Sequence, residues 1–379
     1  MGCSSSVPIE RAPAPNREPL PPRRARTAPP FAELRPEDGF IGKGSLATVR
    51  TARTAGGGRF AFKVMNKAEL VRLKQVDHVW QMDDIAPRLD HPHLMASEPD
   101  LAHDARCVYQ VMELCEQGDL YTLLHHMGRF DSQTAMRCAA QLGSALTFLH
   151  AHDIAHRNMR PEAVLLSRGR LKLGSFCFAK SMGGGKSHTL CGTPEYMAPE
   201  LLLSEGHDIQ VDMWALGVLT YELAVGYTPF GGKRGTEGRD PMAIYQLVLA
   251  GRLDLPRWVD AATRRFVKSC VVAVSKRLCA HELCEHPDLP ADAIGESIFG
   301  GGEGRSTKSD YDGMPFDAVE FTAALAGTIA DPFRRKVTPY GHAIDQMVAD
   351  DELHGGHDGG LYTQSSTQDS SAHDPLTVK

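Results

Sequence analysis

The sequence predicts an α+β fold in which a small antiparallel β-rich lobe precedes a larger α-helical lobe. Short runs of alternating apolar and polar residues follow Phe40, and a Gly-rich turn at residues 56–58 separates two of them, which is typical of antiparallel strands. Beyond Asp131, apolar residues recur instead at the spacing of an amphipathic helix. With 379 residues, 42% of them hydrophobic, the chain can bury a large core.

The first third of the chain divides into a tail and the β-rich lobe. Residues 1–35 are rich in Pro, Ala, Ser and Arg and contain no aromatic residue before Phe31, so we expect a disordered basic tail. Residues 36–112 form the predicted β-rich lobe. Its strands are expected in "IGKGSLATVRTA", "GGGRFAFKVM" and "CVYQVMEL", and a helical segment is expected in "AELVRLKQVDHVWQMDDIA".

Residues 113–290 form the predicted helical lobe. Asp131 and Ser132 provide a cap for a long helix. One face of that helix carries the apolar residues Ala135, Cys138, Ala139, Leu142, Ala145, Leu146 and Leu149. Residues 291–340 are expected to form a C-terminal extension, and residues 341–379 a disordered polar tail.

The overall composition argues against several classes of protein. A formal net charge of −6 gives no sign of nucleic-acid binding. No stretch approaches the roughly 18–20 consecutive apolar residues of a membrane-spanning helix, and the N-terminus lacks the apolar core of a secretory signal. Nine scattered cysteines suit a reducing compartment. We therefore expect the chain on the cytosolic side of any membrane.

One short cluster, "CAHELCEH", raises the question of a metal site. Cys279, His281, Cys284 and His286 are close in sequence, and zinc prefers thiolate and imidazole ligands. Only one such cluster exists, and a helix with a half-buried cysteine face accounts for it. The sequence therefore favours the absence of a metal site here.

The first six residues, "MGCSSS", match the N-myristoylation pattern, with Gly2 as the acceptor. One myristoyl chain binds membrane only marginally, so stable anchoring needs a second signal. Palmitoylation of Cys3 or a basic cluster could supply it, the cluster being Arg11, Arg17, Arg23, Arg24 and Arg26. We expect the acylated protein at the cytoplasmic face of a membrane, with the plasma membrane favoured. If the tail is not acylated, we expect the protein in the cytosol.

Seven motifs resemble those of protein kinases and occur in that family's order between about Gly39 and Val337. "IGKGSLATV" resembles the Gly-rich phosphate loop, "FAFKV" the lysine strand, "VMELCEQGDL" the adenine-binding hinge and "HRNMRPEA" the catalytic loop. "LKLGSFCFAK" resembles the metal-binding segment, "TLCGTPEYMAPE" the activation segment and "DMWALGVLTYELAVGYTPF" the central helix of the large lobe. "VRLKQVDH", "LCGTPEY" and "IADPFRRK" are similar to the cyclic-nucleotide-dependent branch of the AGC serine/threonine group. The resemblance implies a bilobal protein-kinase-like fold.

The resemblance also implies a nucleotide site, yet four catalytic positions depart from the family. The nucleotide-binding candidates are Ile41, Gly42, Gly44, Val49, Ala61, Lys63, Met112, Glu113, Cys115 and Leu165. Asn158 replaces the catalytic aspartate, and its amide cannot accept a proton, so a general-base contribution of roughly 10²- to 10⁴-fold is lost. Ser175 and Ala163 replace the two metal ligands, although magnesium prefers carboxylates. Met82 replaces the glutamate that pairs with the strand lysine, here Lys63.

Other family positions are retained. Thr189 matches the activation-loop phosphosite, and Arg157, Lys180 and His78 match the groups that receive its phosphate. Asp119, Glu162 and Glu222 match the acidic residues that bind arginines of basic substrate or inhibitor peptides. Glu200, Asp212 and Arg277 match structural residues of the large lobe.

The pattern of losses and retentions predicts a membrane-anchored AGC pseudokinase that binds a basic segment of a signalling partner as a scaffold or decoy. We expect no required cofactor, weak ATP binding at most and no Mg²⁺ site. The alternatives are a serine/threonine kinase with low residual activity and a purely structural part of a membrane complex. The identity of the partner and the oligomeric state stay open.

Overall fold

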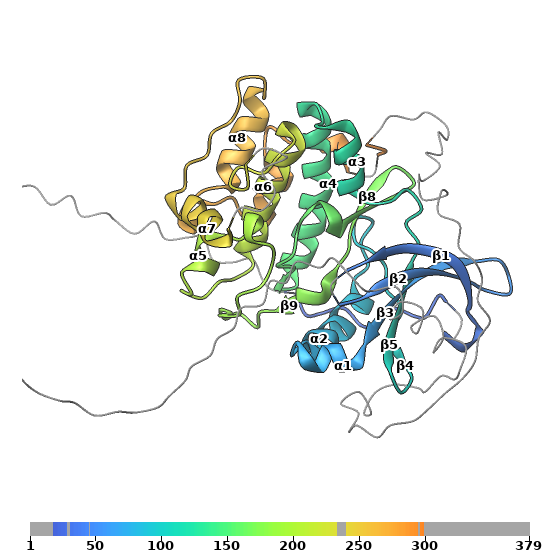
Figure 1. The fold of residues 1–379 in the computed structure, drawn as a ribbon. Coiled ribbons are helices and arrows are strands. Elements are labelled where there is room, and N and C mark those ends of the chain that lie inside the picture. Colours follow the sequence, from blue (N-terminus) through green and yellow to red (C-terminus); the bar gives the residue numbers. More distant parts are fainter. Residues whose placement is uncertain (1–17, 29–30, 45, 233–239, 295, 299–379) are drawn as a thin grey trace, which may run out of the picture.

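The structure, a computed structural model, describes residues 18–28, 31–44, 46–232, 240–294 and 296–298. A curled antiparallel sheet with two helices forms the small lobe, and a bundle of helices forms the large lobe (Figure 1). The predicted fold class, α+β with a bilobal arrangement, is therefore confirmed. Gly2 and Cys3, the rest of residues 1–17 and nearly all of the expected C-terminal extension lie outside the described residues.

The small lobe is built on a five-stranded sheet with the strand order β1-β2-β3-β5-β4. Its strands are β1 (Arg35–Lys43), β2 (Thr48–Arg53), β3 (Arg59–Asn66), β4 (Ala102–His103) and β5 (Cys107–Glu113). Neighbouring strands are all antiparallel. Because side chains alternate along a strand, Phe62 and Val64 of β3 enter one apolar cluster while Ala61 and Met65 enter the main core on the other face. Lys63 has the parity of Ala61 and Met65, which directs it toward the inter-lobe side.

Two helices follow β3 rather than one. α1 (Lys67–Arg72) begins at Asn66, whose side chain accepts a hydrogen bond from Glu69 N, and α2 (Val76–Ile85) follows after a short break. The break contains Lys74 with φ 55°, a left-handed backbone that ends a helix. This places α2 against the 3₁₀ turn Phe176–Phe178 and β9 of the large lobe.

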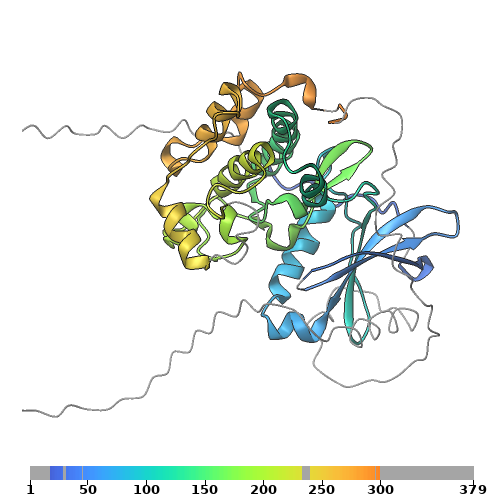
Figure 2. The same cartoon turned by 45° about the horizontal axis from the view of Figure 1, so that its top comes forward.

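The large lobe is organised around one buried helix. It contains α3 (Leu120–Met127), α4 (Ser132–Ala151), α5 (Pro199–Leu202), α6 (Gln210–Val225), α7 (Pro241–Ala250) and α8 (Ala261–Cys270). Every residue of α6 is buried, and α4 and α8 pack on it (Figure 2). Asp131 caps α4 by accepting a hydrogen bond from Thr134 N at 2.8 Å, and the seven apolar residues predicted for one face of α4 are all buried.

Two short two-stranded sheets bring the predicted catalytic segments to the boundary between the lobes. β7 (Val164–Ser167) pairs with β8 (Arg170–Leu173), and β6 (Ile154–Ala155) pairs with β9 (Lys180–Ser181). Met95 N of the small lobe donates to Leu173 O at 2.9 Å, so the hairpin also joins the two lobes.

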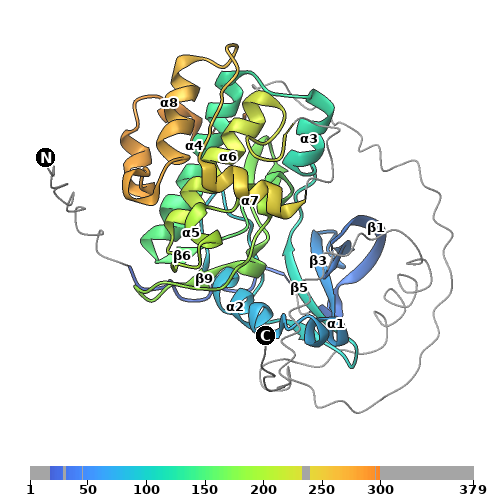
Figure 3. The same cartoon turned by 60° about the vertical axis from the view of Figure 1, so that its left-hand side comes forward.

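Residues 18–28, which belong to the part of the chain expected to be disordered, are packed against both lobes. We call this segment the N-terminal strap. Glu18 N donates to Ala151 O at the end of α4, and Arg24 N donates to Pro87 O after α2, both at 2.9 Å (Figure 3). Just beyond it, Phe31 stacks on Tyr109 of β5 with ring centroids 4.9 Å apart. The prediction of disorder from residue 18 onward was wrong. It was based on local composition, which contains no information on the contacts that this segment makes with distant parts of the chain.

No helix among the described residues is long and apolar enough to cross a membrane. Nor do three or more His, Cys, Asp or Glu side chains of the described part of the chain meet as a metal-binding group. In the "CAHELCEH" segment, Gln210 Nε2 donates to Cys279 Sγ at 3.0 Å and His281 is exposed.

Candidate functional site

The backbone of the catalytic loop is held by one buried carboxylate. Asp212, near the start of α6, accepts hydrogen bonds from His156 N at 2.8 Å, Arg157 N at 2.7 Å and the His150 ring at 3.0 Å. Burial alone would raise the pKa of Asp212, but the hydrogen bonds from His150 and Arg157 N outweigh it and lower that pKa. Asp212 therefore remains ionised and fixes the loop that carries Asn158.

Two of the predicted degenerate residues contact each other directly. Asn158 Nδ2 donates a hydrogen bond to Ser175 Oγ at 3.2 Å, although the two residues are 17 positions apart. Ser175 has φ 60° and ψ 51°, a left-handed conformation that asparagine and aspartate adopt more readily than serine. The backbone thus keeps the shape suited to a carboxylate residue, while a neutral amide and a neutral hydroxyl occupy the site.

The other two degenerate positions are apolar and buried. Met82 is 2% exposed and Ala163 is 3% exposed, and both belong to the main core. Within the described part of the chain, the Lys63 side chain has no hydrogen bond or ion pair. Asp83, the carboxylate next to Met82, forms an ion pair with Arg23 of the strap at 3.1 Å. No carboxylate of α2 replaces the missing glutamate.

The nucleotide-binding candidates lie on or next to β1, β2, β3, β5 and β7. Strand register pairs Gly42 with Val49, and Ala61 with Met112; Ile41 is exposed, and Leu165 lies on β7 beside Asp119. Glu113 Oε1, at the hinge, accepts from Lys172 Nζ at 2.8 Å and from Ala96 N at 2.6 Å. Burial, and then the charge of Glu113, raise the pKa of Cys115 to about 12, so this thiol is neutral and inert. Binding of a nucleotide by these residues stays a prediction, and Lys63 is the one cation among the candidates.

The predicted phosphate receptors lie together, and a serine occupies them. Arg157 Nη1 donates to Ser187 Oγ at 3.3 Å and Lys180 Nζ donates to the same oxygen at 3.2 Å, while Thr189 is exposed. Burial lowers the pKa of His78, and the positive charges of Arg157 and Lys180 lower it further. His78 is therefore neutral next to two cations. The sequence reasoning missed Ser187; its signal was a hydroxyl two positions before Thr189.

Two of the three predicted acidic residues gather around one tyrosine. Tyr196 OH donates a short hydrogen bond to Glu222, and burial, with the charges of Glu222, Glu162 and Glu195, raises the pKa of Tyr196 well above its usual value. Glu222 is buried, whereas the Glu162 side chain is 43% exposed and lies 3.7 Å from Arg160. Glu195, which accepts from Thr228 Oγ1 at 2.8 Å, was not predicted; the only signal was its place beside Tyr196.

Asp119 occupies a separate position at the entrance to α3. Its Oδ1 caps that helix by accepting from Thr122 N at 2.7 Å, and its backbone pairs with Leu165. Because α3 packs on the 3₁₀ turn Pro161–Ala163, Asp119 is near the element that carries Glu162.

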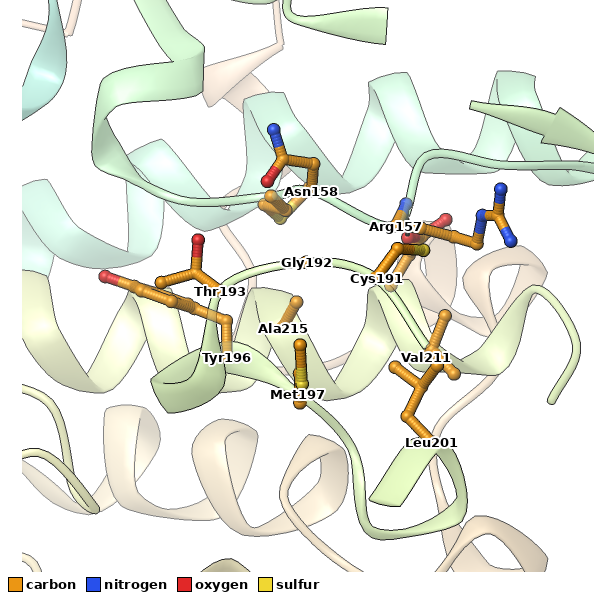
Figure 4. Close-up of a pocket in the computed structure, with 12 residues that line it drawn as sticks. Arg157, Asn158, Cys191, Gly192, Thr193, Tyr196, Met197, Leu201, Val211 and Ala215 are labelled. Atoms are coloured by element: carbon orange, nitrogen blue, oxygen red, sulfur yellow. Dashed lines mark hydrogen bonds between the residues drawn. The ribbon is translucent and has the colours of Figure 1, made fainter. Parts of the chain in front are cut away.

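The large lobe is braced below this site by a buried ion pair. Arg277 donates to both carboxylate oxygens of Glu200, at 2.6 and 3.1 Å, and its guanidinium lies 5.2 Å from the ring centroid of Trp214. A small pocket lies between the catalytic loop and residues 191–197. Asn158 and Arg157 line one side of it, and Cys191 and Thr193 line the other (Figure 4). Gly192 has φ 108°, and a Cβ there would lie 2.9 Å from Arg157 O, so only glycine fits.

Comparison with known proteins agrees with this geometry. The protein kinase domain family matches residues 36–289, so the chain belongs to that family. Human cAMP-dependent protein kinase catalytic subunit PRKX is 38% identical over 62% of this chain. The cAMP-dependent protein kinase catalytic subunit 3 of Drosophila melanogaster is 37% identical over 61%, and human cGMP-dependent protein kinase 2 is 38% identical over 60%. The prediction of an AGC kinase domain near the cyclic-nucleotide-dependent branch is confirmed.

The matched region is only part of each relative. It covers 62% of PRKX, 39% of the Drosophila protein and 28% of cGMP-dependent protein kinase 2. The activity, substrates and partners of this protein are therefore treated as proposals.

Proposed function

We propose that this protein is an AGC pseudokinase that binds a basic segment of a signalling partner and acts as a scaffold or decoy. The observation that carries the proposal is the hydrogen bond between Asn158 and Ser175, at 3.2 Å. In the family these positions supply the base and a metal-binding carboxylate, and here both are neutral. Phosphoryl transfer depends on metal ions and cationic groups that position the phosphates and neutralise their charge, and Lys63 supplies only one positive charge.

The acidic groups support the binding half of the proposal. Glu162 and Glu222 share Tyr196 as a neighbour, and Glu195 adds a third carboxylate. An arginine forms strong charge-assisted bonds with a carboxylate that is partly shielded from water. A partner segment with two or more arginines therefore suits this surface better than a neutral or acidic segment. We propose a protein partner and no nucleic acid.

A thermal-shift series with ATP, with and without Mg²⁺ or Mn²⁺, tests the pseudokinase proposal. We expect a small shift with ATP that does not increase with either metal, and no label transfer in an autophosphorylation assay. Metal-dependent stabilisation together with labelled product that disappears in Lys63→Ala would instead establish the alternative, a kinase of low activity.

A peptide-binding experiment tests separately whether the acidic residues bind a basic segment. A fluorescent peptide with paired arginines should bind more tightly than its Arg→Ala counterpart, and Glu162→Gln should weaken it on the order of tenfold, the effect of one lost charged hydrogen bond. Glu116→Gln, a change at an exposed carboxylate near the small lobe, is the matched control. Glu222→Gln is informative only beside a stability measurement, because Tyr196 donates to that buried carboxylate. Equal binding of both peptides, with no melting shift from ATP, would favour the purely structural alternative.

We also propose that the protein is anchored to the cytoplasmic face of the plasma membrane through myristate on Gly2 and palmitate on Cys3. Three arginines of the predicted basic cluster form ion pairs with carboxylates of the small lobe: Arg23, Arg24 and Arg26. Cys3 is therefore the better second signal. Metabolic labelling with a myristate analogue, compared between the native protein and Gly2→Ala, tests the anchor.

Finally, we propose that phosphorylation of Thr189 orders the activation segment. A phosphate there would compete with Ser187 Oγ for Arg157 and Lys180 and would raise the pKa of His78. Nuclear magnetic resonance titration of His78 in the phosphorylated protein tests this proposal, and an unchanged pKa would contradict it.

A further inference from the structure

The N-terminal strap crosses a line of carboxylates on the small lobe. We call these residues, Asp83, Asp90, Glu98 and Asp100, the acidic strip. Arg23 contacts Asp83 at 3.1 Å and Asp100 at 3.3 Å, Arg24 contacts Asp90 at 3.7 Å, and Arg26 contacts Asp100 at 3.6 Å. Three arginines within four residues are therefore neutralised by carboxylates that come from α2 and from the segment between α2 and β4.

Thr27 directly follows these arginines and completes the contact. Its backbone N–H donates to Glu98 Oε2 at 2.9 Å, and its hydroxyl donates a short hydrogen bond to Oε1 of the same carboxylate. The residue is exposed. An exposed hydroxyl in an extended segment without helix or strand, preceded by "RRAR", has the chemistry that a kinase with an acidic substrate groove would recognise.

We propose that Thr27 is a phosphorylation site for such a basophilic kinase and that its phosphate releases the strap. In this reaction Thr27 Oγ1 forms a bond to the γ-phosphorus of Mg·ATP, the bond from that phosphorus to ADP breaks, and the hydroxyl proton passes to the base of the modifying kinase. The inference is independent of the proposed function, because it uses neither the cleft nor the acidic groove.

The release follows from the charges around Oγ1. A phosphothreonine carries about −1.5 to −2 at neutral pH and has no hydroxyl to donate to Glu98, so the attractive contact becomes repulsive. The phosphate also competes with Asp100 for Arg26 and Arg23. Loss of Arg23 from Asp83 removes a contact from the outer side of α2, whose inner side already lacks the pair with Lys63. The phosphate therefore loosens α2 as well as the strap.

The test uses the full chain with Mg·ATP and the catalytic subunit of cAMP-dependent protein kinase as the probe enzyme. We expect peptide mapping by mass spectrometry to find phosphate on Thr27. Hydrogen exchange of residues 18–28 should then rise by about tenfold or more, while that of α4 stays constant. Thr27→Val should show neither the phosphate in the strap nor the rise.

Two further variants separate release from simple accessibility. Glu98→Gln removes the charge that repels the phosphate, so the rise in exchange on phosphorylation should be several-fold smaller. Asp100→Asn loosens the strap beforehand and should speed the modification of Thr27. The proposal is overturned if Thr27 acquires no phosphate in either the native protein or Asp100→Asn, or if phosphorylated Thr27 leaves the exchange of residues 18–28 unchanged.

Discussion

At the scale of residues, the four positions that depart from the family carry neutral side chains in an ordered arrangement. Asn158 Nδ2 donates a hydrogen bond to Ser175 Oγ, and Met82 and Ala163 are part of the main core. A buried carboxylate without a metal or an ion-pair partner would cost several kcal/mol, and neutral side chains at these positions avoid that cost. Restoring Asn158 to aspartate alone would therefore return a base without the metal ligands it works with.

The Arg277–Glu200 pair leads to a prediction about stability. Arg277→Ala leaves the buried Glu200 carboxylate without its two strongest donors, so the free energy of unfolding should fall by about 3–5 kcal/mol. Arg72→Ala, which removes an exposed ion pair with Glu69, is the control and should change little. Urea denaturation of both variants checks this. Equal losses in both would mean that burial of the pair does not decide its contribution.

A second prediction concerns His207, which is buried at 2% exposure behind the activation segment. Burial, and then the charge of Arg157, lower the pKa of His207 to about 4. The unfolded chain therefore binds a proton first on acidification, and stability is lost as the pH falls from about 6.5 toward 4. His207→Gln should reduce this loss by on the order of 1–3 kcal/mol, measured by urea unfolding between pH 4.5 and 7. The same slope in native protein and variant would contradict it; exposed His188→Gln serves as the control.

At the scale of elements, a buried polar pair sits between the strands and α2. Gln110 Nε2 of β5 donates to Ser97 Oγ at 2.8 Å, and both residues are about 5% exposed or less. The two buried polar groups therefore satisfy each other within an otherwise apolar region.

This pair can be tested with a double-mutant cycle. Ser97→Val alone leaves the Gln110 amide buried without its acceptor, and Gln110→Met alone leaves the Ser97 hydroxyl without its donor, so each should cost about 1–3 kcal/mol. The double change Ser97→Val with Gln110→Met replaces both polar groups by apolar ones and should be close to neutral or stabilising. Chemical denaturation of the single and double variants gives the coupling. Additive losses would show that the two side chains do not depend on each other.

At the scale of the whole molecule, the N-terminal strap is the part that touches both lobes from outside. His152 of the large lobe donates to Pro19 O at 3.0 Å, and Arg88 of the small lobe donates to Pro21 O at 3.1 Å. Removal of residues 1–28 should therefore lower the melting temperature by several degrees more than removal of residues 1–17. High salt should reduce that difference, since ion pairs supply part of it. Differential scanning calorimetry of both truncations decides; identical midpoints would show that the strap contributes no stability.

The sequence by itself determined the family, the two lobes and the departures from the catalytic motifs, because these depend on local features. Strand alternation, the Asp131 cap and the apolar face of α4 are local in sequence, and Asn158, Ala163 and Ser175 each lie inside a motif of fixed spacing. A change of residue type at such a position can be recognised without coordinates, since the chemistry of an amide or a hydroxyl does not depend on the fold.

Only the tertiary structure decided how distant residues pair. The contacts of Ser187 with Arg157 and Lys180, of Tyr196 with Glu222, and of Arg23 with Asp83 join segments separated by up to 60 positions. The strap is the clearest case: its composition is that of a disordered tail, and its order comes from carboxylates that α2 and the segment before β4 bring together in space. The attraction between opposite charges depends on their separation in the folded protein. The spacing of the same residues along the sequence does not determine that separation.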